Sequence, residues 1–193
     1  MAQFRCLYLD VDGVLTDGRI PVAEDGSTSR AFHIHDGLAI RAFQRLGGTV
    51  VIVTGKTSGS VAHRAKELGI EHVIQGSDDK LSDLRALLEN KLHIPLNEIA
   101  AIGDDLPDLP VLQNCGYPMA VANAVAEVRQ AARFVTERRG GDGAVREAIE
   151  HLLRLNGQSD KMLELYTDQT MSDEPSQGSS SPERSTTAGE ARR

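Results

Sequence analysis

The chain has 193 residues with 28 acidic and 21 basic side chains, which gives a formal net charge of −7. This acidic balance disfavours nucleic acid and anionic membranes as partners. No apolar stretch approaches the length of a membrane span, and no signal-peptide pattern opens the chain, so we expect no membrane partner and a cytoplasmic protein.

Apolar runs that suit buried strands alternate along the chain with segments of helical periodicity. We predict strands near residues 4–9, 49–53, 72–75, 99–102 and 117–121, and helices near residues 38–46, 58–68, 80–91, 107–114 and 144–155. Alternating strands and helices predict an α/β fold with a Rossmann-like, doubly wound parallel sheet.

The segment at about residues 18–35 departs from this alternation. Its Glu24-Asp25-Gly26-Ser27 stretch has the composition of a turn between two extended segments, and it predicts a β-hairpin insertion. The hairpin is too short to be a cap domain. We expect one domain over residues 1–156, a C-terminal segment over 157–171 that can form an amphipathic helix, and a disordered tail over 172–193, where polar residues dominate.

Two carboxylates follow the first predicted strand. Asp10 and Asp12 are one residue apart, so an extended chain directs both side chains to one face while Val11 points away. Ligands of open α/β sheets bind at the carboxyl ends of the strands, and two converging carboxylates there favour a bound cation. Taken alone, the pair could equally be turn or capping residues.

Three further segments place polar residues at later strand ends. Thr54-Gly55 offers a hydroxyl and an approachable amide for a phosphate, and Lys80 lies at a helix start, where a cation is unfavourable unless an anion is near. Asp104, Asp105 and Asp108 follow the fourth predicted strand. Each could alone be a cap or a solvated charge, but their order on successive strand ends favours one common site.

These residue types suit phosphate monoester hydrolysis. Asp10 is the candidate nucleophile, and Asp12 is the candidate general acid that protonates the leaving oxygen and then activates water. Thr54, Lys80 and the Gly13 and Gly55 amides would bind the phosphate. The oxygen-only ligand set predicts Mg²⁺, held by the side chains of Asp10 and Asp104 and the Asp12 carbonyl. We expect Asp105 to hold a metal-bound water and Asp108 to orient Lys80 or such a water.

The order of these motifs resembles the haloacid dehalogenase superfamily, with its motifs on Asp10 and Asp12, Thr54, Lys80, and Asp104 with Asp105 and Asp108. Over residues 4–155 the chain is similar to its capless 3-deoxy-D-manno-octulosonate 8-phosphate (KDO 8-phosphate) phosphatases, as the 10–18, 103–106 and 139–147 segments indicate. The resemblance implies a Mg²⁺-dependent phosphatase of lipopolysaccharide biosynthesis acting on a sugar-acid phosphate. It also implies a homotetramer that the hairpin helps to assemble, in which a neighbouring subunit, or its C-terminal segment, closes each active site.

Some positions differ from that family's usual residues. Lys56 stands where an Arg is usual, and His33, His35 and Asp142 replace Asn, Arg and Arg. Lys56 keeps the charge that a substrate carboxylate needs, and the two histidines could contact substrate or face solvent.

Two alternatives stay open. A nine-carbon sugar acid, 2-keto-3-deoxynononate or N-acetylneuraminate 9-phosphate, could be the substrate instead. An inert oligomerisation module partnered with a sugar-nucleotide synthetase is the non-enzyme alternative, although such a module would be expected to have lost Asp10 or Lys80.

Overall fold

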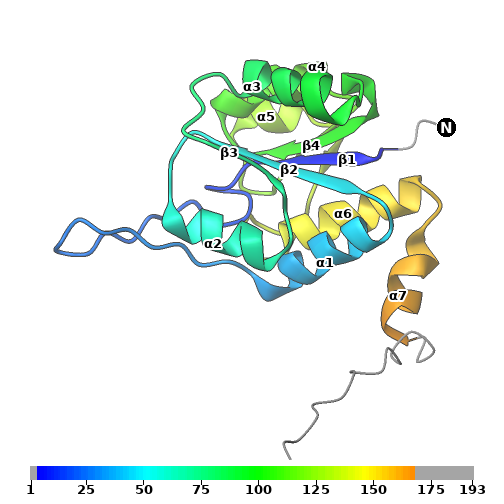
Figure 1. The fold of residues 1–193 in the computed structure, drawn as a ribbon, viewed down its shortest axis with the longest axis horizontal. Helices are drawn as coiled ribbons and strands as arrows, with labels where there is room; N and C mark the ends of the chain where they lie inside the picture. Colours follow the sequence, from blue (N-terminus) through cyan, green and yellow to red (C-terminus); the bar gives the residue numbers. More distant parts are fainter. Residues whose placement is uncertain (1–3, 168–193) are drawn as a thin grey trace, which may run out of the picture.

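The computed structural model describes residues 4–167, which form a six-stranded parallel sheet with helices on both faces (Figure 1). The strand order is β3-β2-β1-β4-β5-β6, so the first strand lies inside the sheet between β2 and β4. The strands are β1 (Cys6–Leu9), β2 (Thr49–Thr54), β3 (His72–Gln75), β4 (Ile99–Gly103), β5 (Tyr117–Ala120) and β6 (Phe134–Val135). The predicted fold class is confirmed.

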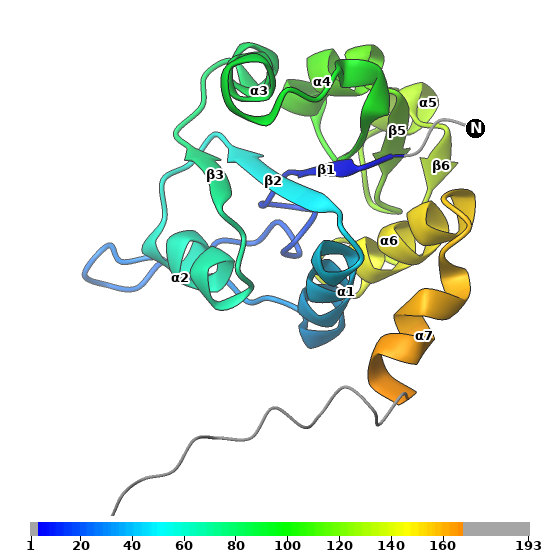
Figure 2. The same cartoon turned by 45° about the vertical axis from the view of Figure 1, so that its right-hand side comes forward.

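Helices cover both faces of the sheet, as Figures 1 and 2 show from two directions. One layer contains α1 (Ile34–Arg45), α2 (Gly59–Glu67) and α6 (Ala144–Leu155), and the other contains α3 (Lys80–Leu87), α4 (Leu109–Asn114) and α5 (Ala126–Ala131). The final helix, α7 (Ser159–Thr167), packs against α1 and α6. No helix among residues 4–167 is long and apolar enough to cross a membrane.

The core lies on both sides of the central strands because these strands are apolar on both faces. Every residue of β1 and β4 is buried, as expected for inner strands of a parallel sheet covered by helices. In α6, the buried residues recur at helical spacing from Ala144 to Leu153 and face the sheet. The core therefore fixes the carboxyl ends of β1, β2 and β4 relative to one another.

The chain changes direction at the centre of this sheet. From β1 it proceeds through α1 on one face to β2, whereas the connection into β4 comes through α3 on the other face. Crevices at such a switch point are where open α/β sheets bind ligands. The carboxyl ends of β1 and β4 form this crevice.

Several boundaries differ from those predicted. α1 begins at Ile34 instead of residue 38, because His33 caps it by accepting a hydrogen bond from the His35 amide. The predicted 80–91 helix ends as α-helix at Leu87 and continues as a π-helical turn over Leu88–Leu92. α5 and β6, which have six and two residues, were not predicted.

The segment predicted as a hairpin does fold back on itself beside α2, but its two sides pair at only one antiparallel bridge, Val22 with Thr28 (Figure 1). Two backbone hydrogen bonds accompany this bridge, from Ala23 N to Ser27 O and from Ser29 N to Pro21 O. Residues 168–171 of the predicted C-terminal segment and the predicted tail over 172–193 lie outside the described residues.

Candidate functional site

The loop after β1 brings its carboxylates to the crevice through a tight turn. The amides of Val14, Leu15 and Thr16 all donate to the Val11 carbonyl, at 3.2, 3.0 and 3.0 Å. Gly13 has a φ of +107°, and a Cβ there would overlap the Asp104 carboxylate. Glycine at this position therefore allows the loop after β1 to lie directly against a carboxylate that follows β4.

Lys80 links the two carboxylate groups of the crevice. Its Nζ lies 2.6 Å from Asp10 Oδ1 and 2.8 Å from Asp108 Oδ1, and all three side chains are buried. The first residue of α3 is therefore an internal cation held by two anions. This contact accounts for a lysine at a helix start, because the carboxylates offset the unfavourable helix dipole.

Asp108 follows β4 and is linked to Asp10, the candidate nucleophile, through Lys80. Its side chain is almost fully buried. Its Oδ1 also accepts a hydrogen bond from the Tyr8 hydroxyl at 3.0 Å, and its Oδ2 accepts from the Asp104 amide at 3.0 Å. Asp105 caps the short 3₁₀ helix Leu106–Asp108, with its Oδ1 2.8 Å from the Leu106 amide. The capping interpretation of Asp105 and Asp108 is confirmed, and the same turn places both residues beside the crevice, where their predicted site roles stay a prediction.

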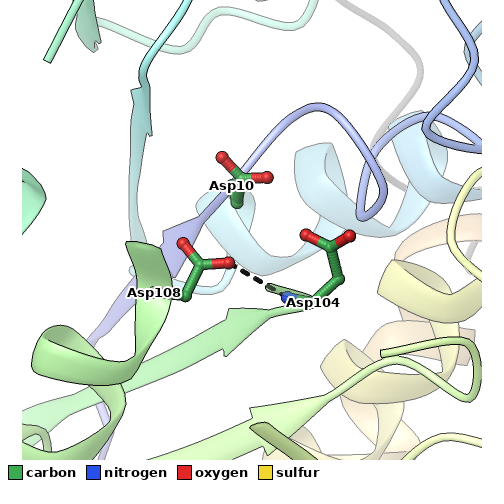
Figure 3. A group of neighbouring side chains, drawn as sticks. All are labelled: Asp10, Asp104 and Asp108. Carbon is green, nitrogen blue, oxygen red and sulfur yellow. Dashed lines mark hydrogen bonds between the residues drawn. The ribbon is translucent and has the colours of Figure 1, made fainter. Parts of the chain in front are cut away.

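Three carboxylates meet without enough positive charge among them. Asp10, Asp104 and Asp108 each offer an oxygen within 4.8 Å of the other two (Figure 3). Burial raises the pKa of Asp10 to about 6, with Asp108 adding to the rise and Lys80 opposing it. Burial, followed by the charges of Asp10 and Asp108, raises the pKa of Asp104 to about 8.

The opposite shift occurs at Lys80. Burial alone would lower the pKa of Lys80, but the attraction of Asp10 and Asp108 outweighs it, so this pKa lies above its ordinary value. One lysine thus faces three carboxylates. A divalent cation among them would remove the excess negative charge, and the all-oxygen donor set fits Mg²⁺.

Not all three carboxylates are equally free to bind a cation. Both oxygens of Asp108 already accept hydrogen bonds, from Lys80 and Tyr8 on one side and from backbone amides on the other. Asp10 and Asp104 have oxygens that remain open to the crevice. The donor set therefore fits a metal on Asp10 and Asp104, with Asp108 holding the surrounding groups in place.

A cavity of about 790 Å³ opens above these carboxylates. Thr54, buried at the end of β2, and the next two residues, Gly55 and Lys56, form one wall. The remaining lining residues come from the segments that follow β1, β3 and β4, including the first turns of α3 and α4: Asp10, Asp12, Ser77, Asp78, Asp79, Lys80, Leu81, Asp104, Asp105, Pro107, Asp108 and Pro110. Its size suits a small phosphorylated metabolite.

Three predicted site residues do not line this cavity. Gly13 lies beside it, beneath the Asp104 carboxylate. His33 caps α1, and His35 borders a different cavity with Arg138 and Arg146. The predicted hairpin segment, which reached about residue 35, was too long at this end, because His35 belongs to α1 and His33 is its cap. Within one chain, neither histidine reaches the space in front of Asp10.

Sequence reasoning missed two residues that contact the site. Tyr8 donates to Asp108 from within β1, where its side chain is fully buried. Arg30 donates hydrogen bonds to both carboxylate oxygens of Asp12, with its Nε 2.6 Å from Oδ1 and its Nη2 2.9 Å from Oδ2. A buried tyrosine in an apolar strand hints at a polar partner, but no spacing in the sequence relates Arg30 to Asp12.

The fold and this cluster at its switch point define the class of protein, and comparison with known proteins agrees. Residues 70–149 match the family model described as haloacid dehalogenase-like hydrolase. The KDO 8-phosphate phosphatase KdsC of Escherichia coli (strain K12) is 42% identical over 159 residues, which cover 82% of this chain and 84% of that protein.

Solved structures give the same result. The KDO 8-phosphate phosphatase of Moraxella catarrhalis, in complex with magnesium, phosphate and KDO, has a TM-score of 0.82 and 40% identity, covering 86% of this chain and 94% of that one. The cobalt-bound phosphatase of Haemophilus influenzae has a TM-score of 0.78 and 33% identity, covering 81% and 91%. The chain belongs to the KDO 8-phosphate phosphatase family of the haloacid dehalogenase-like hydrolases. This confirms the resemblance deduced from its motifs.

Proposed function

We propose that this chain is a Mg²⁺-dependent phosphatase that hydrolyses KDO 8-phosphate to KDO and phosphate. The observation that carries the proposal is the buried bridge from Lys80 to Asp10 and Asp108 at the switch point of the sheet. The bridge places a carboxylate beside a cation, in a cavity that the hydroxyl residue Thr54 also lines. Family membership supports the same reaction.

The first half of the reaction transfers the phosphoryl group to the protein. A carboxylate oxygen of Asp10 attacks phosphorus, and the bond between phosphorus and the sugar oxygen breaks. Asp12 gives a proton to the departing sugar oxygen, which leaves as an alcohol. Thr54 and the Gly13 and Gly55 amides hold the phosphate oxygens, and Lys80 neutralises negative charge as the group moves.

The second half returns Asp10 to its starting state. Asp12, now a carboxylate, takes a proton from a water molecule, and that water attacks phosphorus. The bond between phosphorus and the Asp10 oxygen breaks, so inorganic phosphate is released and Asp10 is a carboxylate again. One aspartate thus acts as acid and then as base without net change.

Mg²⁺ would be held by the carboxylates of Asp10 and Asp104 and the backbone carbonyl of Asp12, with Asp105 binding a water of the ion. When bound, the ion neutralises the carboxylates and polarises the phosphate. The donor set and the raised pKa values of Asp10 and Asp104 support this assignment.

Substrate choice and assembly are further parts of the proposal. Lys56 borders the cavity and would attract the carboxylate of a sugar acid. Two large apolar side chains are exposed in this region, Val22 in the hairpin and Ile34 at the start of α1. Such exposed groups favour burial against another subunit, in line with the proposed homotetramer whose neighbours close the active sites, in the cytoplasm. His33 and His35 would then contact substrate only through such a neighbour.

The test is phosphate release from a panel of esters with Mg²⁺ and with excess chelator. The panel contains KDO 8-phosphate, the two nine-carbon 9-phosphates and simple hexose phosphates, with the Asp10→Asn variant as the control for contaminating phosphatases. We expect KDO 8-phosphate to lead in kcat/KM by orders of magnitude and chelator to stop turnover reversibly. A leading nine-carbon ester would contradict the substrate, and turnover of no ester would favour the inert module.

A further inference from the structure

Asp12 is held by a residue that no motif includes. Both of its carboxylate oxygens accept hydrogen bonds from Arg30, at 2.6 Å from Nε and 2.9 Å from Nη2. The Arg30 side chain is 3% exposed and that of Asp12 is 19% exposed. The pair therefore lies at the edge of the cavity with its guanidinium almost completely shielded from water.

The geometry of this pair fixes more than charge. A planar guanidinium that binds both oxygens of a carboxylate also fixes the plane of that carboxylate, which a lysine ammonium cannot do. The catalytic lysine of the same cavity, Lys80, is already engaged by Asp10 and Asp108. Among residues 4–167, Arg30 is the cation that contacts the Asp12 carboxylate.

Arg30 also comes from a different part of the chain. It follows the hairpin, on the segment that leads into α1, and it borders a second cavity with Phe32, Ile34 and Arg64. Asp12 belongs to the loop after β1. The contact thus ties that loop to the base of the hairpin, where the backbone pairing is limited to one bridge.

We propose that Arg30 is a positioning residue that holds Asp12 in the orientation needed to protonate the leaving group. The inference rests on the proposed function, because it assigns Asp12 the role of general acid. One Asp12 oxygen stays on Arg30 while the other carries the proton. The proton moves to the sugar oxygen as its bond to phosphorus breaks, and Asp12 is left as a carboxylate that accepts both hydrogen bonds again.

Leaving-group chemistry separates this role from a merely structural one. A sugar alkoxide is a poor leaving group that needs a proton, whereas nitrophenolate departs without one. Loss of a positioned acid therefore slows the alkyl ester selectively. The measurement is kcat/KM for the best sugar phosphate and for nitrophenyl phosphate, because kcat/KM reports the steps up to departure of the first product.

The variants are Arg30→Met, which removes both the charge and the two-point hydrogen bonding of the guanidinium, and Arg30→Lys, which keeps the charge alone. The matched control is Arg19→Met, just before the hairpin, where the Arg19 side chain is 87% exposed and its Nη1 lies 3.9 Å from Asp17 Oδ2. For Arg30→Met we expect a loss of about 10–100-fold with the sugar phosphate and less than about 3-fold with the nitrophenyl ester, since general acid catalysis contributes roughly 10²–10⁴-fold. Arg30→Lys should show a smaller loss of kcat/KM that is again larger for the sugar phosphate than for the nitrophenyl ester. The Arg19→Met control should show no loss with either ester.

Equal losses with both esters would overturn the proposal, as would full activity of Arg30→Met on the sugar phosphate. A cycle with Asp12→Asn adds a second criterion. If Arg30 acts through Asp12, adding Arg30→Met to Asp12→Asn should change the sugar phosphate rate little further, and multiplying losses would contradict it. Urea unfolding of each variant verifies that it is folded. If Arg30→Met does not fold, the comparison is made with Arg30→Lys, which retains the buried charge.

These results are separable from a failure of the proposed function. The criterion is a ratio between two esters, so a wild-type preference for another sugar phosphate would contradict the proposed substrate and leave the Arg30 result intact. Release of phosphate from no ester would contradict both proposals.

Discussion

Removing the Lys80 ammonium should destabilise the fold and impair phosphoryl transfer together. In Lys80→Met, Asp10 and Asp108 lose a cation that lies 2.6 and 2.8 Å from their oxygens, in a place where all three side chains are at most 8% exposed. Breaking a buried ion pair from one side costs about 3–5 kcal/mol, because the remaining charge stays buried without a partner. For a domain of this size that corresponds to roughly 6–20 °C in Tm.

Thermal and urea unfolding in chelator, at neutral pH, measure this loss. Lys66→Met is the matched control, because Lys66 is an exposed lysine of α2. Lys80→Met with Asp108→Asn should recover part of the stability, since one of the two unpaired charges is gone. Turnover with Mg²⁺ should fall by about 10²–10³-fold, the usual effect of removing one group that stabilises transition-state charge. A Tm within about 2 °C of the control would refute the argument that the bridge is a buried, strongly coupled contact, since roughly 1 kcal/mol gives such a shift.

Three other variants test separate parts of the account. Asp10→Asn should leave unfolding unchanged and reduce turnover to below about 1%, as expected for a nucleophile, and a larger residual rate would contradict that role. Gly13→Ala should lower the free energy of unfolding by about 1–3 kcal/mol and weaken Mg²⁺ binding measured by calorimetry, because the new Cβ adds strain at positive φ and displaces Asp104. The control is Gly26→Ala, with φ +81° and open space around it, and equal effects on metal binding would count against the clash. Burial lowers the pKa of His151 below 6.5, so the unfolded chain binds a proton that the folded chain refuses, and the contribution of His151 to stability should fall as pH drops below about 6.5. The raised pKa values of Asp10 and Asp104 act in the opposite sense, so the variant is compared with the wild type at each pH. In urea unfolding, His151→Gln should gain stability relative to the wild type as pH falls below 6.5, and a constant difference between the two would contradict this role.

The sheet and the carboxyl ends of its strands could be predicted because they depend on local signals. The strands β1, β2 and β4 are short apolar runs. Each run stops at or just before a polar residue that lines the crevice, as at Asp10 and Thr54. Parallel topology then brings these ends together whatever the details of packing. The predicted position of Lys80 at a helix start also follows from local periodicity.

Other features depend on tertiary contacts and had no local signal. The two-residue strand β6 exists because Phe134 and Val135 pair with β5, and such a short segment has no detectable period. The start of α1 depends on the His33 cap, which a histidine does not ordinarily signal. Arg30 meets Asp12 only because the hairpin returns to the loop after β1. Contacts between segments that are distant in the sequence are therefore the features that could not be predicted from the sequence.

Phosphoryl transfer through Asp10 can be observed directly as a phosphoryl group on that side chain. Asp12→Asn mixed with nitrophenyl phosphate and Mg²⁺ should release nitrophenol in a burst, because departure needs no acid while hydrolysis of the intermediate needs a base. Acid quenching, proteolysis and mass spectrometry should then find one phosphoryl group on the peptide that contains Asp10, and none after Asp10→Asn. Steady release of nitrophenol without a burst, from an enzyme whose Asp10 peptide is never phosphorylated, would contradict the central claim.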